Sequence, residues 1–155
     1  KEMDIQYVNL NTIDDLKQND DDDSTAKQII SIGNHEHLEM IEIRIKNKNG
    51  INYILNFCVI IVSFIIPDEN DINEIIYVEK LHAICGFICD GIYKIYDSGT
   101  NMMFTFDWVN YWIFDGRSDI LKSELNKYWG DYVHDTQFLM GVYLNEKYMP
   151  LSLKR

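Results

Sequence analysis

The chain has 155 residues, 46% of them hydrophobic, and a formal net charge of −11 with a pI near 4.6. From this length and composition we expect residues 1–155 to form a single domain or the C-terminal part of a larger one. The negative charge argues against a nucleic-acid backbone or an anionic membrane as the main partner, so protein or peptide partners are expected.

The first part of the chain combines a short apolar stretch with a strongly acidic one. Residues 5–10 predict a short strand. Residues 19–24 contain four consecutive aspartates, and we expect an acidic solvated loop there because a run of like charges packs poorly. Residues 40–45 alternate apolar and polar side chains, which is typical of a strand with one buried face.

A long apolar strand is predicted in the middle of the chain. Residues 47–50 end in Asn49-Gly50, a strong hairpin signal. Residues 53–66 are apolar on both faces, which favours a central position in a sheet. The apolar run is short, is interrupted by polar residues and ends at Pro67, so we expect no membrane span.

Residues 82–98 predict a β-hairpin. Two apolar strands flank Asp90-Gly91, a pair suited to a type I′ turn. Counting outward from a two-residue loop places Ile84 opposite Asp97. His82 lies two residues from Ile84, so it shares a face with Asp97 as a diagonal neighbour, within reach of a side-chain contact.

The last third of the chain changes character. Residues 104–114 are rich in aromatic side chains, which could line a peptide groove but which we interpret as core packing. Residues 119–129 have apolar residues near helical spacing, with Ser118 as the expected N-cap and Gly130 as the stop. Residues 138–144 predict a last strand. The pattern therefore predicts an α+β fold, with a mostly antiparallel sheet of about five or six strands and one or two helices.

His82 and Asp97 are the candidate catalytic residues. A histidine and a carboxylate on adjacent strands can act as a general base and the group that orients it, because the carboxylate fixes the imidazole tautomer and stabilises the imidazolium. The alternative is a strand histidine that is hydrogen-bonded near an ordinary turn.

The three cysteines, Cys58, Cys85 and Cys89, all lie in apolar runs. The odd number indicates no disulfide framework and favours an intracellular, reducing compartment. Cys85 and Cys89 should lie on the strand face opposite His82. Cys58 is a weak candidate nucleophile, because a central strand lacks the helix N-terminus or electropositive pocket that activates a thiolate. We expect all three to be buried thiols.

Metal ligands are sparse. Residues 35–37, His-Glu-His, could offer two imidazoles, but no third ligand is evident and a polar loop is favoured. Cys85 and Cys89 have no second Cys/His pair of matching spacing. We therefore expect neither a metal nor a cofactor.

Several short motifs between residues 53 and 110 resemble a known family. They are Tyr53-x-Leu55-Asn56, His82-Ala83-Ile84-Cys85-Gly86-Phe87-x-Cys89, Ile95-Tyr96-Asp97-Ser98 and Asp107-Trp108. This pattern resembles the C-terminal half of papain-like cysteine peptidases of large DNA viruses, and more widely the second half of transglutaminase-like folds. The resemblance implies half of a papain-like fold, with His82 as base, Asp97 as orienter, and virion or host proteins as partners.

The chain departs from that family at the nucleophile. The family order is Cys, His, Asp, with the Cys typically opening a helix, and only Cys58 precedes His82 here. Either the nucleophile lies outside this segment, upstream of Lys1, or it has been lost. The first case gives a thiol hydrolase acting on a peptide or isopeptide bond. The second gives a non-enzymatic viral structural (capsid-associated) or host-interaction protein.

Overall fold

The computed structural model describes residues 6–30, 41–68 and 76–149. The elements in chain order are β1 (Tyr7–Leu10), α1 (Ile13–Gln18), β2 (Ala26–Ile30), β3 (Arg44–Lys46), β4 (Asn52–Asp68), β5 (Ile76–Cys89), β6 (Ile92–Asp97), β7 (Met102–Thr105), a π-helical segment η2 (Trp108–Phe114), α2 (Ser118–Trp129), β8 (Val133–Asn145) and a 3-10 turn η3 (Glu146–Tyr148).

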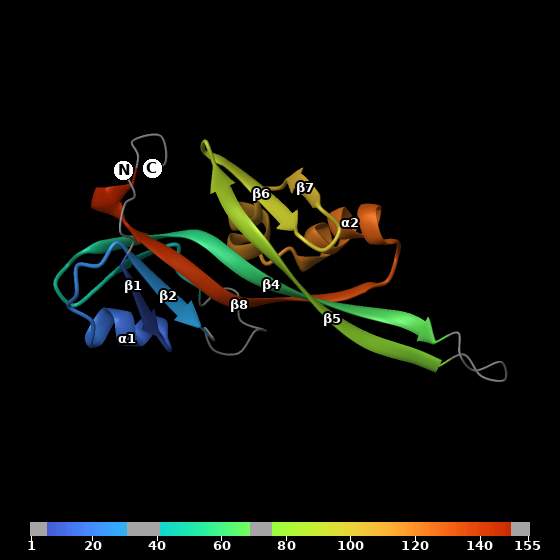
Figure 1. Ribbon diagram of the computed structural model, residues 1–155, viewed down its shortest axis with the longest axis horizontal. Helices are drawn as coiled ribbons and strands as arrows, with labels where there is room; N and C mark the ends of the chain where they lie inside the picture. Colours follow the sequence, from blue (N-terminus) through green and yellow to red (C-terminus); the bar gives the residue numbers. More distant parts are fainter. Residues whose placement is uncertain (1–5, 31–40, 69–75, 150–155) are drawn as a thin grey trace.

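The described strands form one sheet with the order β1-β2-β8-β4-β5-β6-β7, and β3 pairs with β4 beside this path (Figure 1). Among the described strands, only β1 and β2 run parallel, and the other pairs are antiparallel. The predicted α+β class and mostly antiparallel sheet are confirmed. The predicted number of strands was too low, because the sheet has eight. The two strands without a sequence prediction are β2 and β7, which have five and four residues and show no clear alternation of apolar and polar side chains.

The long strand β4 is the centre of the sheet, as its two apolar faces predicted. It pairs with β8 along one edge and with β5 and β3 along the other. The strand extends beyond the predicted residues 53–66, because Pro67 and Asp68 still belong to β4 and pair with β5. Beyond the start of β8, β4 and β5 continue as a two-stranded ribbon (Figure 1).

The β5–β6 hairpin turns where the sequence predicted. Cys89 pairs with Ile92, and the two loop residues both have positive φ, 50° at Asp90 and 76° at Gly91. A type I′ turn needs this backbone conformation at both central positions, which Asp-Gly adopts readily. The turn therefore sets the register that brings β6 beside β5.

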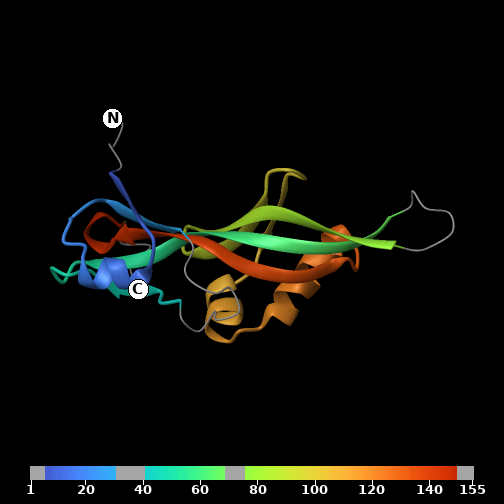
Figure 2. The same cartoon turned by 90° about the horizontal axis from the view of Figure 1, so that it is seen from below.

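The helical segments η2 and α2 lie against the same face of the long strands (Figure 2). Trp108 and Trp112 from η2 are fully buried, which confirms the core interpretation for these two rings, whereas Phe114 is exposed. The predicted helix is confirmed as α2, and Gly130 with φ 74° ends it. Ser118 is the first helical residue rather than the cap. No helix in the described ranges has the length and apolar character needed to cross a bilayer.

The contact between Trp108 and Gly86 fixes η2 on the sheet. A Cβ atom at Gly86 would lie 2.9 Å from a ring carbon of Trp108 and 2.9 Å from Cys58 Sγ. The Trp108 indole N–H also donates to the Phe87 carbonyl at 3.2 Å. A side chain at position 86 would collide with this ring, so the contact requires glycine there.

The acidic stretch is not fully solvated, so the prediction for residues 19–24 is wrong in part. Asp20 and Ser24 are buried, while Asp21 to Asp23 are exposed. The Lys27 ammonium, itself fully buried, lies 3.0 Å from one carboxylate oxygen of Asp20 and 2.9 Å from the other. One cation from β2 thus neutralises the innermost aspartate.

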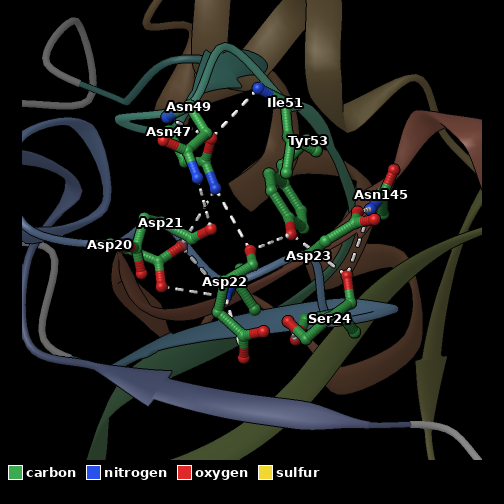
Figure 3. A network of polar contacts seen from close by, with 12 residues as sticks. Asp20, Asp21, Asp22, Asp23, Ser24, Asn47, Asn49, Ile51, Tyr53 and Asn145 are labelled. Atoms are coloured by element: carbon green, nitrogen blue, oxygen red, sulfur yellow. Dashed lines mark hydrogen bonds and ion pairs between the residues drawn. The ribbon is translucent and has the colours of Figure 1, made fainter.

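Side chains from distant elements bind the backbone of this acidic loop (Figure 3). Asn47 donates to the Asp22 carbonyl at 3.1 Å, and the Tyr53 hydroxyl donates to the same carbonyl at 3.0 Å. Asn145 at the end of β8 donates to the Ser24 carbonyl at 3.2 Å. The loop is therefore part of the folded structure, because its carbonyls find donors that the local sequence does not reveal.

Candidate functional site

His82 and Asp97 meet as the hairpin register predicted. His82 on β5 and Asp97 at the end of β6 share a face, and His82 Nε2 lies 2.7 Å from Asp97 Oδ1. The Asp97 side chain is fully buried, whereas 40% of the His82 side chain is exposed. The protein therefore holds the imidazole at Nε2, and the ring as a whole is partly open to solvent.

The turn after β6 holds the carboxylate of Asp97 in place. The Gly99 N–H donates to Oδ1 at 3.0 Å, and the Thr100 hydroxyl donates to Oδ2 at 2.7 Å. Burial opposes the charged form, but the hydrogen bonds from His82, Thr100 and Gly99 outweigh it and keep the pKa of Asp97 below its usual value. Asp97 is thus a charged acceptor at neutral pH.

An ionised Asp97 determines which nitrogen of His82 carries the proton. Because the carboxylate can only accept, the hydrogen bond places a proton on Nε2. In the neutral imidazole the lone pair is then on Nδ1. This is the tautomer that a general base needs, with the carboxylate on the far side of the ring.

The pair opens into an apolar cleft of about 410 Å³. The cleft is lined by Phe64, Ile66, Lys80, Leu81, His82, Asp97, Thr100, Trp129 and Tyr132. Trp129 at the end of α2 stands edge-on to the His82 ring, with centroids 6.0 Å apart, and also contacts Phe64 at 5.2 Å. A larger hollow of about 540 Å³ lies along α2, but its lining is mostly charged and polar and lacks this pair.

Sequence reading missed most of this cleft. Thr100 could have been found as a hydroxyl shortly after Asp97 in a turn, a position that commonly bonds the aspartate. Trp129 and Tyr132 carried no such signal, because they approach His82 only through the packing of α2 on the sheet. Their contribution depends on tertiary structure.

The cysteines within the chain lie away from the His82 imidazole. Cys58 shares the sheet face of His82, but it pairs with Gly86 whereas His82 pairs with Val62. Four residues along β4 separate these positions by about 13 Å. Cys58 is also fully buried, and burial raises the pKa of its thiol far above the usual range. The prediction of a buried Cys58 in a central strand is confirmed.

The other two cysteines are less buried than predicted. Cys85 is half-buried on the sheet face opposite His82, and burial raises the pKa of its thiol. Cys89 is exposed beside the hairpin turn, which contradicts the expected burial. It is the last residue before the loop, where no element of the described ranges covers its side chain.

The described residues contain no group of three His, Cys, Asp or Glu side chains placed to hold a metal ion. The candidate ligands at residues 35–37 lie outside the described ranges.

Comparison of the chain with protein-family models, curated proteins and solved structures finds no match. The geometry around His82 is therefore the basis for a functional proposal.

Replacing Asp97 by asparagine is expected to make the free energy of unfolding decrease less steeply as the pH is lowered into the acid range. Because the folded-state pKa of Asp97 lies below its unfolded value of about 4, its stabilising contribution is present above that pH and is lost as the pH falls through the folded-state pKa. Urea unfolding from neutral pH down to about pH 2 measures this slope.

Asp119→Asn is the matched control for that experiment. Asp119 also has a lowered pKa, caused first by its hydrogen bond with Arg117, but both side chains are more than half exposed. Exposed pairs contribute little to stability. Equal slopes for Asp97→Asn and the unmodified chain would show that the Asp97 hydrogen bonds do not stabilise the fold.

Proposed function

We propose that His82 and Asp97 form the general-base half of a papain-like thiol hydrolase that acts on a peptide or isopeptide bond. The supporting observation is the 2.7 Å bond between His82 Nε2 and the buried, ionised Asp97 at the rim of an open cleft. The attacking cysteine belongs outside these 155 residues. The resemblance to viral papain-like peptidases, with its order of Cys, His and Asp, is consistent with this assignment.

Each residue has a separate role in the proposed reaction. His82 Nδ1 accepts the proton of the attacking thiol, and the thiolate then adds to the carbonyl carbon of the scissile bond. The imidazolium returns the proton to the leaving amine as the carbon–nitrogen bond breaks. Water next hydrolyses the acyl-thiol intermediate, with His82 again taking a proton. Asp97 stays ionised and orients the ring, while Thr100 and Gly99 hold Asp97.

A second candidate function is a non-enzymatic viral structural or host-interaction module on the same fold. It is favoured by the separation of Cys58, Cys85 and Cys89 from the His82 imidazole. In that case the cleft binds a protein segment without cleaving it. Both candidates place the protein in a reducing, intracellular setting, in keeping with three free thiols.

The deciding experiment measures cysteine reactivity in the protein expressed from its complete reading frame. Wild type, His82→Ala, Asp97→Asn and Cys58→Ser are treated with iodoacetamide near neutral pH, and adducts are located by mass spectrometry. We expect one rapidly modified cysteine outside residues 1–155, whose rate falls about 100-fold or more in His82→Ala because the base is gone. Cys58→Ser should leave that rate unchanged.

Cys89 is the internal reference in every sample, because it is exposed on the hairpin away from His82. Its labelling rate should be equal in all four proteins. If no cysteine in the protein or in a co-purifying chain depends on His82, the hydrolase proposal fails and the non-enzymatic module is the better account. Melting temperatures of the variants confirm that each is folded.

A further inference from the structure

The strand β5 has an open edge next to the candidate site. Its pairing with β4 runs from Ile76 to Phe87, but its pairing with β6 covers only Cys85 to Cys89. Among the described residues, positions 76–84 therefore have a strand on one side only, and β5 runs on past the end of β6 (Figure 1). β6 ends at Asp97, just where the cleft begins.

The hairpin register tells which backbone groups face this open edge. In a two-residue hairpin the residues flanking the loop form a hydrogen-bonded pair, so Cys89 points its N–H and C=O toward β6. Counting by twos along β5, the backbone groups of Ala83, Leu81 and Glu79 point the same way. Within the described ranges, no backbone hydrogen bond reaches them from that side.

Large apolar side chains lie beside this edge on both faces, together with Lys80 on the His82 face and Glu79 on the other. Phe64, Trp129 and Tyr132 line the cleft on the His82 face. On the opposite face, Leu81 is 68% exposed and Tyr77 is 62% exposed. A strand added here would place alternate side chains against these two surfaces, because successive residues of a strand point to opposite faces.

We propose that an extended peptide binds as an additional strand along β5 residues 76–84, in line with β6, with a large apolar side chain in the His82 cleft. This inference rests on the proposed function, since the peptide would be the substrate that is presented to His82. Main-chain hydrogen bonds to Ala83, Leu81 and Glu79 give affinity, and the cleft selects the side chain.

The open backbone favours a polypeptide over other occupants of an apolar cleft. A small apolar ligand could fill the space beside Trp129, but it would make no hydrogen bonds to the row of N–H and C=O groups on β5. An extended chain satisfies both the backbone and the cleft. A second copy of the chain, paired edge to edge through β5, is the competing occupant, and the test below separates the two.

The first test uses fluorescein-labelled Lys-Thr-Val-Phe-Val-Thr-Lys-amide and measures binding by fluorescence anisotropy. Replacing its central Phe by Gly should weaken binding about tenfold or more, because the ring is buried in the cleft. Two further versions carry N-methyl groups on alternate amides. One should bind about tenfold or more weakly, since it loses the hydrogen bonds to β5, and the other should bind almost as well as the parent.

The second test changes the protein instead of the peptide. Leu81→Pro removes an N–H that faces the open edge and leaves the bonds to β4 intact, because proline is tolerated on an edge strand. Leu81→Thr is the matched control, since it changes the side chain and keeps the N–H. Only Leu81→Pro should reproduce the loss seen with the methylated peptide. If Leu81→Pro unfolds, the two methylated peptides still decide.

Each alternative has a distinct result. Failure of the Phe peptide to bind at millimolar concentration, or equal binding of the two methylated versions, overturns strand addition. A dimer with β5 amides protected from hydrogen exchange assigns the edge to a second copy and also overturns it. If the peptide binds through its backbone but no cysteine depends on His82 for its reactivity, the hydrolase proposal alone is contradicted. If a cysteine depends on His82 but the peptide does not bind through its backbone, strand addition alone is contradicted.

Discussion

Replacing Lys27 by methionine is expected to lower the free energy of unfolding by about 3–5 kcal/mol at neutral pH. Methionine fills a similar volume, but it leaves the Asp20 carboxylate buried without its cation. Because the Asp20 side chain is almost fully buried, its uncompensated charge is expected to make the variant less stable. Urea unfolding followed by circular dichroism measures the change.

Two companion variants make this expectation specific. Asp20→Asn combined with Lys27→Met removes both charges and should recover most of the lost stability, because a neutral amide is far cheaper to bury than a carboxylate. Lys17→Met breaks the exposed ion pair with Glu42 and should cost less than about 1 kcal/mol. A Lys27→Met variant no less stable than Lys17→Met would mean that Asp20 becomes solvated, and the acidic loop would be as open as its sequence suggests.

Trp108→Ala is expected to cost about 3–5 kcal/mol, since it empties a fully buried site between η2 and the sheet. The change also removes the donor to the Phe87 carbonyl. Phe114→Ala in the same segment is the control: its ring is 61% exposed, so a much smaller loss is expected. Similar losses for the two variants would contradict a core role for Trp108.

The same packing predicts a coupling between Trp108 and Gly86. Gly86→Ala alone should cost about 1–3 kcal/mol, because its methyl group would collide with the Trp108 ring and Cys58 Sγ. In the Trp108→Ala background one of these contacts is gone, so the added methyl should cost less. Thermal or urea unfolding of the four proteins gives the coupling energy directly. If the stability losses of the two single variants simply add in the double variant, a methyl group at position 86 does not collide with the Trp108 ring.

The local sequence alone determined the hairpin and the facing of His82 and Asp97. Asp90-Gly91 suits the turn conformation, the two-residue loop fixes the register, and the period of two assigns each side chain to a face. The continuous apolar run of β4 marked that strand as central, since both of its faces are apolar. These features could be predicted from each segment alone, because the residues that determine them lie within a few positions of one another in the sequence.

Only the tertiary structure decided what surrounds those residues. Trp129 reaches His82 because α2 packs on the sheet, and Asp20 is buried because Lys27 from β2 meets it. Cys89 is apolar in its sequence context yet exposed, because no described element covers the end of the hairpin. Contacts of this kind join segments far apart in the chain. Whether a charge or a thiol is buried depends on which distant residues pack against it, and the local pattern of apolar and polar residues does not identify those residues.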